Sequence, residues 1–270
     1  MERELPLITI EGTDFLVDVN KLELREKANP KNIIAYEDME EVDDGYSFRY
    51  SRLEKNVSIN VNLEVVTIKI PEFVKLDPEG MAAKYNIDDV NGKTDFEVMV
   101  DQEAYDLRVK KGMLPTVEIA GHTFYVDMRM DKLRPKDEFL SKGIVFSDIE
   151  SYYDRDKREY TIPYNPKTYE FQEPDYVNIK EFPKDLIAVS FPHERLLDRI
   201  GWNRKYFDDL KSGLLKCGLN LRFTAKRVPW KKTFLAGVIQ INIRPDDTPK
   251  KIEEKKQTHP KQIKLKGRRM

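Results

Sequence analysis

A repeated stretch of 21 residues constrains this chain more than any other feature. Residues 5–25 are LPLITIEGTDFLVDVNKLELR, and residues 114–134 are LPTVEIAGHTFYVDMRMDKLR. At a constant shift of 109 positions the two stretches share nine residues, which is far more than unrelated stretches share by chance. The sequence therefore predicts an internal duplication.

A second pair of matching stretches supports the duplication. Residues 71–85 and 192–206 share Pro, Leu, Asp, Gly, Lys and Tyr in register, at a shift of 121 positions. The difference between the two shifts places about twelve additional residues in the second copy, and surface loops tolerate such insertions. We divide the chain into a first β-rich unit (residues 1–113), a second (114–245) and a tail (246–270).

The apolar pattern predicts an α+β fold in which most strands are antiparallel. Residues 7–10 and 15–19 alternate around Gly12 and indicate a β-hairpin, and the same pattern recurs around Gly121. Residues 33–36 and 46–50 are predicted to pair with each other, and in the second unit residues 144–146 are predicted to pair with residues 160–162. One apolar face per strand is typical of antiparallel sheets.

Helices are predicted at a few places only. Asp77 is a favourable N-cap and Pro78 suits the first helical position, so a helix is expected up to about residue 85. Further helices are expected at 101–111 and 202–217. Residues 96–100 are predicted to form a strand, and residues 165–182, rich in Pro and Tyr, a long surface loop.

Charge is distributed unevenly along the chain. The net charge is −1, but residues 248–270 carry nine Lys or Arg against two Glu. The tail is therefore predicted to be disordered and able to contact the phosphates of nucleic acid by charge alone. The candidate contacts are Lys250, Lys251, Lys255, Lys256, Lys261, Lys264, Lys266, Arg268 and Arg269.

Few residues suit catalysis, a cofactor or a metal ion. The three histidines are not spaced as metal ligands with Cys217, and no phosphate-binding glycine loop or G-x-S-x-G motif is present. Cys217 ends a predicted helix, where the dipole raises a thiol pKa, and a buried role is expected for it. No catalytic, cofactor-binding or metal-binding residue is predicted.

The cysteine count and the length of the apolar runs bear on the cellular compartment of the protein. A single cysteine excludes an intramolecular disulfide and is typical of a reducing compartment. No apolar run approaches the ~20 residues that span a bilayer, and no signal peptide is visible. The sequence predicts a cytoplasmic protein without a membrane segment.

Two sets of residues are candidates for binding. Asp18 and Arg25 recur at the same spacing as Asp127 and Arg134. They form either two equivalent binding sites or, as we favour, a structural ion pair or cap at the end of each hairpin. The second set comprises tyrosines that suit recognition or that fold onto their own sheet, namely Tyr152, Tyr153, Tyr164, Tyr169 and Tyr176.

The repeated pattern LPxxxIxGxxFxVDxxxxxLR, together with LDxxGxxxKY, resembles accessory proteins associated with mobile elements of gut Bacteroidetes. The resemblance covers the body of the chain and not the tail. That group has no assigned reaction or ligand, so the resemblance implies an accessory role and no site residue.

The sequence favours a non-enzymatic binding protein that presents two duplicated β-rich units to a protein partner. The first alternative is a nucleic-acid-associated accessory protein that uses the basic tail. The second is an enzyme with a carboxylate-lined site between the two units, which would need a deep pocket containing carboxylates of perturbed pKa.

Overall fold

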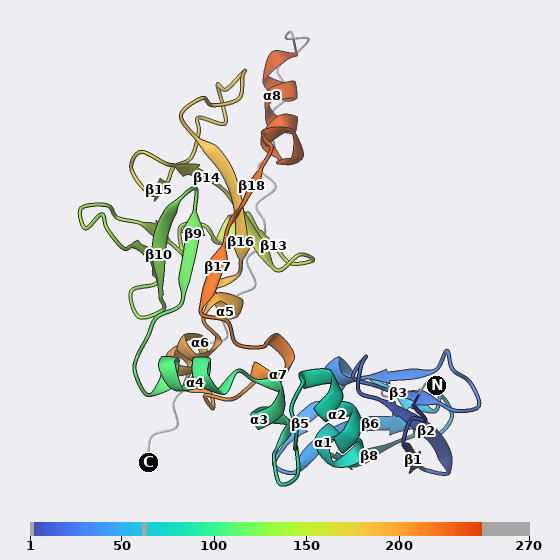
Figure 1. Cartoon of the computed structure of the whole chain (residues 1–270). Helices are drawn as coiled ribbons and strands as arrows, with labels where there is room; N and C mark the ends of the chain where they lie inside the picture. Colours follow the sequence, from blue (N-terminus) through green and yellow to red (C-terminus); the bar gives the residue numbers. More distant parts are fainter. Residues whose placement is uncertain (1–2, 61–63, 245–270) are drawn as a thin grey trace, which may run out of the picture.

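The structure is a computed structural model that describes residues 3–60 and 64–244. It consists of two similar halves, each built from antiparallel strands and short helices, as the repeated sequence predicts (Figure 1). We call residues 3–113 the first half and residues 114–244 the second half. The predicted basic tail lies outside the described residues.

The first half contains two sheets of four strands each. One has the order β1-β2-β3-β4, and in the other β6 pairs with β5, β7 and β8. Its strands are β1 (Leu7–Ile10), β2 (Thr13–Asp18), β3 (Glu23–Glu26), β4 (Ile33–Ala35), β5 (Glu40–Val42), β6 (Gly45–Ser51), β7 (Asn56–Val57) and β8 (Val65–Pro71). Its helices are η1 (Tyr36–Asp38), α1 (Phe73–Leu76), α2 (Pro78–Tyr85), α3 (Asp95–Met99) and α4 (Gln102–Val109).

The second half repeats this arrangement and extends it. One sheet has the order β12-β11-β10-β9-β17, with β17 parallel to β9. In the other sheet β14 pairs with β13, β15 and β16, and β16 also pairs with β18. Its strands are β9 (Thr116–Ile119), β10 (His122–Asp127), β11 (Lys132–Pro135), β12 (Ile144–Val145), β13 (Tyr153–Asp154), β14 (Glu159–Asn165), β15 (Glu170–Phe171), β16 (Ile187–Pro192), β17 (Arg222–Thr224) and β18 (Lys226–Val228). Its helices are η2 (Glu150–Tyr152), α5 (Glu194–Leu197), α6 (Arg199–Tyr206), α7 (Leu214–Cys217), η3 (Trp230–Lys232) and α8 (Leu235–Ile243).

The halves agree in backbone detail as well as in order. Glu11 and Ala120 both precede a glycine in the first hairpin turn, and all four of these turn residues have positive φ. Left-handed backbone is costly for a residue with a Cβ, so its recurrence at the shift of 109 shows that the turn itself is duplicated. Each half also has its own hydrophobic core, one centred on Phe15 and the other on Phe124.

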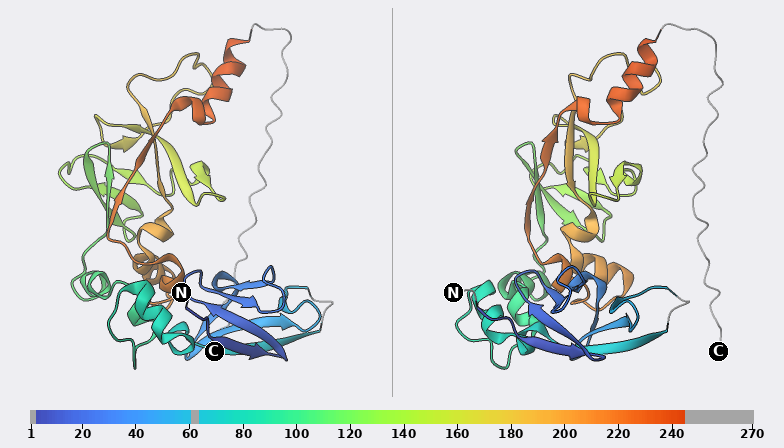
Figure 2. Two further views of the ribbon diagram at one scale, coloured as in Figure 1. Left: turned by 45° about the vertical axis from the view of Figure 1, so that its right-hand side comes forward. Right: turned by 90° about the vertical axis from the view of Figure 1, so that its right-hand side faces the viewer.

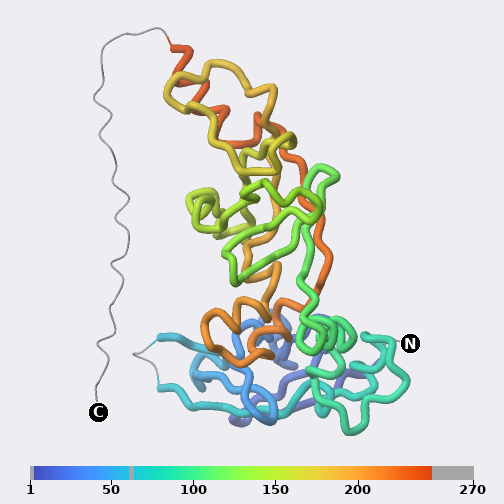
Figure 3. Tube along the Cα trace, turned by 90° about the vertical axis from the view of Figure 1, so that its left-hand side faces the viewer, coloured from blue at the N-terminus to red at the C-terminus, as the bar shows by residue number. Residues whose placement is uncertain are grey.

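Helices join the two halves. Figures 2 and 3 show the helical segments of the second half between its strands and the first half, with α8 at the end farthest from the first half. Val100, Ile200 and Leu214 form a third buried cluster at this junction. Lys216 donates hydrogen bonds to the backbone oxygens of Met39 (2.6 Å) and Glu37 (3.1 Å). The junction therefore combines apolar packing with specific hydrogen bonds.

In each half the N-cap residue of a helix pairs with an arginine that precedes the first strand of that half. Arg108 forms a buried ion pair of 2.7 Å with Asp198, the N-cap of α6, whose carboxylate also accepts from the Gly201 amide. Arg3 contacts Asp77, the N-cap of α2, in the same way, with one hydrogen bond of 2.6 Å.

Two predictions of strand pairing were wrong. Ile33–Ala35 pairs with β3 rather than with β6, and Ile144–Val145 pairs with β11 rather than with β14. Each sheet therefore extends its opening hairpin by two more strands before the chain crosses to the next sheet. The 3₁₀ helices η1 and η2 make this crossing in the first and second halves.

Two helix and strand predictions need correction. Residues 96–100 lie largely in α3, because Thr94 and Glu97 form a capping box that begins a helix there. The helix predicted at 202–217 is interrupted: α6 ends at Phe207, which has a left-handed backbone, and α7 begins only after Gly213. The segment between them lies at the junction and forms one wall of the site described below.

Candidate functional site

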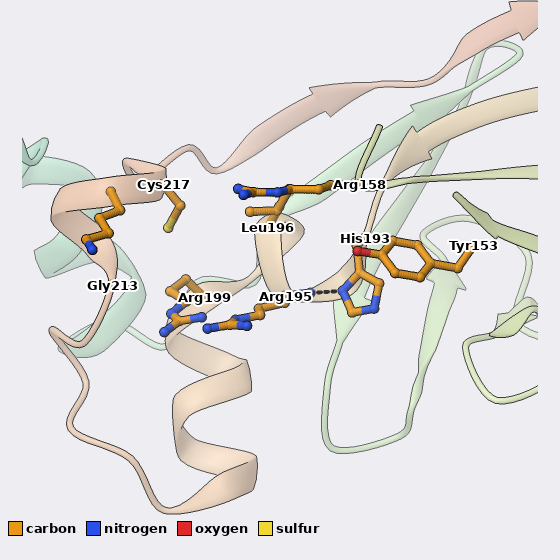
Figure 4. A pocket seen from close by; sticks show the side chains of 9 residues that line it. Tyr153, Arg158, His193, Arg195, Leu196, Arg199, Gly213 and Cys217 are labelled. Carbon is orange, nitrogen blue, oxygen red and sulfur yellow. Dashed lines mark hydrogen bonds between the residues drawn. The ribbon is translucent and has the colours of Figure 1, made fainter. Parts of the chain in front are cut away.

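A hollow of about 340 Å³ opens in the second half, beside the junction (Figure 4). We call it the cationic hollow because four of its lining residues are arginine or lysine. Its lining residues are Tyr153, Arg158, His193, Arg195, Leu196, Arg199, Gly213, Lys216 and Cys217.

The strands and short helices of the second half place these cations. Arg158 lies in the turn between β13 and β14, with a left-handed φ of 54°. Arg195 lies in α5, where its amide donates to the His193 Nδ1 atom at 3.1 Å. Arg199 is the first residue of α6, directly after the N-cap Asp198. Residues from a turn and two consecutive helices thus converge on one space (Figure 4).

The cationic hollow has no carboxylate among its lining residues. Within residues 3–60 and 64–244, neither Arg158, Arg195, Arg199 nor Lys216 forms an ion pair. Arginine keeps its charge at any physiological pH. The hollow therefore concentrates positive charge without a fixed counter-ion.

Arg199 is the most buried of these four cations. Only 8% of its surface is exposed, and its Nε donates to the Ser212 backbone oxygen at 2.8 Å. Burial, and then the neighbouring Arg195, lower the pKa of Arg199. A buried cation normally has a carboxylate partner, as Arg108 has in Asp198. Arg199 instead has a backbone oxygen and an open cavity.

The other end of the hollow is aromatic. The Tyr153 and His193 ring centroids are 4.5 Å apart, and His193 stacks on Tyr160 at 5.3 Å. Burial lowers the pKa of His193, so its ring is neutral at pH 7, with Nε2 3.2 Å from Glu194 Oε2. Figure 4 shows Tyr153 and His193 on one side of the hollow and Cys217 on the opposite side.

Cys217 is exposed in this hollow, which corrects the expectation of a buried role. Partial burial of its sulfur raises the pKa of the thiol, although the cations of Arg199 and Arg195 act in the opposite direction. The thiol is thus mostly protonated at neutral pH, and its nucleophilicity is low.

A second hollow of about 490 Å³ lies between the two halves and is lined in part by the segment between α6 and α7. We call it the acidic hollow. The carboxylates that line it come from both halves, and they are Glu41, Asp43, Glu72 and Asp209. It matches the position between the units that the enzyme alternative requires. Asp43 and Asp209 are exposed, Glu41 and Glu72 are half-buried, and Lys211 lines the same hollow.

The predicted tyrosines do not form one surface. Tyr152 and Tyr176 share a hydrogen bond of 2.6 Å beside Phe234, and Tyr153 lines the cationic hollow. Tyr169 packs against the ring of His122 at 4.2 Å. Tyr164 is fully buried in the core of the second half and is not available to a partner.

The repeated Asp–Arg residues lie close together in both halves. Arg25 and Asp18 are 3.4 Å apart, and Arg134 and Asp127 are 3.6 Å apart. Each aspartate also accepts a backbone amide three residues later, from Lys21 and from Met130. This geometry is that of a turn cap at the end of each hairpin.

Three properties of the whole chain bear on the class of site. No cluster of three or more potential metal-ligating side chains occurs among the described residues. Within the same residues, no helix has both the length and the apolar character that crossing a membrane requires. The phosphate contacts predicted for Lys250–Arg269 lie outside the described part of the chain.

Sequence reasoning missed the cationic hollow altogether. Arg158 is far from Arg195 and Arg199 in the sequence, and each is one of many charged residues in a chain with 35% charged residues. One signal was available. The stretch HERLLDR aligns with EFVKLDP at the shift of 121, and cations have replaced Val74 and Pro78 there.

Comparison of the chain with protein-family models, with curated proteins and with solved structures gives no match.

Proposed function

We propose that this protein is a non-enzymatic binding protein with two duplicated units, and that the cationic hollow of the second half receives an anionic group of its ligand. The observation that carries the proposal is Arg199. It is a buried cation with no carboxylate partner among the described residues, and it faces a cavity in which Arg195 and Arg158 also end.

The physical argument rests on the cost of an uncompensated buried charge. Removing one partner of a buried ion pair costs about 3–5 kcal/mol, because the remaining charge loses its compensation. An oxyanion in the hollow would supply that compensation, and arginine matches phosphate or carboxylate through two parallel hydrogen bonds. Binding would relieve the repulsion between Arg195 and Arg199.

The chemistry of the hollow supports binding over catalysis. Both nitrogens of His193 are engaged, Nδ1 by the Arg195 amide and Nε2 by Glu194. The raised pKa of Cys217 leaves little thiolate. A bound anion would meet hydrogen-bond donors on several sides, but neither an activated nucleophile nor a free general base.

The test is isothermal titration calorimetry, in which the full-length protein is titrated with inorganic phosphate at constant ionic strength. Constant ionic strength removes general screening from the comparison. Arg158→Gln and Arg195→Gln each remove one exposed cation of the hollow, and each should weaken binding about tenfold, since a charged hydrogen bond contributes ~1.5–3 kcal/mol.

Arg155→Gln is the matched control. Arg155 is exposed in the same β13–β14 turn as Arg158 but does not line the hollow. It should bind phosphate as the unaltered protein does. Equal weakening by Arg155→Gln and Arg158→Gln would attribute binding to general positive charge and would reject the hollow as the site.

The second candidate function is contact of the basic tail with nucleic acid. It is favoured by the +7 charge of residues 248–270 against a body of −8. Such contact would be independent of sequence and would weaken steeply with salt. Deletion of residues 248–270 should abolish nucleic-acid binding while leaving phosphate binding in the hollow unchanged, so the two candidates are separable. The accessory role implied by the resemblance fits either one.

A further inference from the structure

We infer that the ligand of the cationic hollow is a nucleoside monophosphate, whose phosphate meets the arginines and whose base lies against Tyr153 and His193. This inference rests on the proposed function and adds the class of ligand. It follows from the size of the hollow, the chemistry of its two ends and the charges that surround each end.

The hollow is too large for a bare oxyanion. A water molecule has a share of about 30 Å³ of liquid volume, and bonded atoms take less space than that, so a phosphate ion of five heavy atoms would fill less than half of a hollow of about 340 Å³. Pockets for small organic ligands begin at about 300 Å³. The hollow therefore fits a compact ligand that carries an organic group beside its phosphate.

The two ends of the hollow differ in the group that each accepts. At one end are the guanidinium groups of Arg158, Arg195 and Arg199 (Figure 4). At the other end are a tyrosine ring and a neutral imidazole ring. Aromatic side chains bind nucleobases by stacking, and every base offers a flat face for it. A ligand with a phosphate and a flat ring at opposite ends satisfies both.

The surrounding carboxylates fix the direction of the ligand. Among the charges that act on His193, Glu194 raises its pKa more than Arg195 lowers it, and Glu150 adds to the rise, so the neighbouring charge at the aromatic end is negative on balance. An anionic group would be repelled from that end. The charge that acts most strongly on Arg199 is the cation of Arg195, and the carboxylates of Asp208 and Glu41 act on it more weakly. The phosphate therefore belongs with the arginines, and the uncharged ring with Tyr153 and His193.

The test compares five ligands on the full-length protein by calorimetry: inorganic phosphate, ribose 5-phosphate, phenyl phosphate, adenosine and adenosine monophosphate. We expect adenosine monophosphate to bind about tenfold more tightly than ribose 5-phosphate, and adenosine to bind weakly. Equal affinity of adenosine monophosphate and ribose 5-phosphate would overturn the nucleotide inference and leave the proposed function standing. Tightest binding of phenyl phosphate would also overturn it, because the ring would then belong directly on the phosphate. Binding of none of the five would overturn both.

A pair of variants places the base. Tyr153→Leu should leave the affinity for ribose 5-phosphate unchanged and should remove most of the tenfold gain of adenosine monophosphate. Tyr125→Leu is the control, because Tyr125 is a half-buried tyrosine of the other sheet that does not line the hollow. Loss of affinity for both ligands in Tyr153→Leu would contradict the assignment of the ring to Tyr153.

A second measurement does not depend on the folding of a variant. In the unaltered protein, saturation transfer from aromatic protein protons should reach the base protons of adenosine monophosphate more strongly than its ribose protons. Equal transfer to base and ribose would contradict a base that lies against the aromatic end of the hollow.

Discussion

At the start of α1 in the first half, a buried carboxylate accepts the backbone amides, whereas at the start of the equivalent α5 the ring of His193 accepts the amide of Arg195. Asp95, at the start of α3, accepts the amides of Phe73 (2.8 Å) and Val74 (2.7 Å) and the hydroxyl of Tyr46. The equivalent hydroxyl in the second half, that of Tyr160, donates to Glu194 of α5 itself. No carboxylate reaches across from α7, the counterpart of α3, because α7 begins with Gly213 and Leu214.

The residues next to Tyr46 and α1 also differ in charge from those next to Tyr160 and α5. Glu41 pairs across the sheet with Tyr46 in the first half, and Tyr153 pairs with Tyr160 in the second. Glu72, which precedes α1, corresponds to His193, which precedes α5. The duplication has thus kept the residues that cap helices and turns while the residues around the hollows have diverged. That divergence separates a structural position from the proposed binding position, and variants at both positions test the separation.

The largest effect is expected from Arg108→Ala. It leaves Asp198, which is 1% exposed, without its ion-pair partner, and breaking a buried pair costs about 3–5 kcal/mol of unfolding free energy. The equivalent Arg3→Ala also leaves a buried aspartate, Asp77, but should cost only about 1–2 kcal/mol, because the Arg3 side chain is 36% exposed and water already screens that pair. Urea denaturation followed by circular dichroism measures both. Equal losses would show that burial does not distinguish the two pairs.

Asp95→Ala is the next most destabilising change. It removes the acceptor of two buried amides and one buried hydroxyl, and unsatisfied buried groups cost about 1–3 kcal/mol each, partly relieved by relaxation, so we expect a loss of about 3 kcal/mol. Glu194→Ala should cost about 1 kcal/mol, because Glu194 is partly exposed and α5 caps its own amide through His193. A larger loss for Glu194→Ala would reverse the structural roles assigned to the two positions.

Gly80→Ala and Gly201→Ala should cost similar amounts, about 2 kcal/mol each. An added Cβ would lie 2.2 Å from Asp77 Oδ2 in the first half and 2.1 Å from Asp198 Oδ2 in the second, which forces the N-cap side chain to move. Thermal unfolding of the two variants side by side measures the costs. If only one variant lost stability, the two N-terminal turns would not be equivalent, although their sequences match.

The sequence predicted the duplicated framework because its signals are local. Asp77 and Asp198 cap their helices, and Gly12 and Gly121 form their turns, through contacts within a few residues. Which strands pair is a long-range property, and that is where the predictions were wrong. The partner of Ile33–Ala35 is decided by the extension of the opening hairpin, which no local pattern records. The capping box at Thr94 and Glu97 was a local signal for α3, and an alternating apolar pattern concealed it.

The cationic hollow could not be predicted because its charges meet only after folding. Arg158 and Arg199 are brought together by the β14–β16 pairing and by the interruption between α6 and α7. The sequence shows that many arginines are present. The lack of an ion-pair partner among the described residues, which distinguishes Arg199 from Arg108, depends on three-dimensional surroundings.

The smallest expected effect concerns how Asp95 changes stability with pH. Burial raises the pKa of Asp95, although hydrogen bonds from Tyr46, Val74 and Phe73 oppose the rise. The folded state therefore binds the Asp95 proton more tightly than the unfolded state, in which the pKa is about 3.9. It follows that Asp95 favours folding at low pH, and that this contribution is lost as the pH rises from about 4 through the folded-state pKa.

Asp95→Asn cannot titrate and lacks this dependence. The free energy of unfolding of the unaltered protein minus that of the variant should thus decrease with rising pH and then become constant. Taking the difference removes carboxylates with lowered pKa, such as Glu26 and Asp154, whose stabilising effect has the opposite sign. A difference that increased with pH would mean that the three hydrogen bonds outweigh burial and that Asp95 is held as a carboxylate.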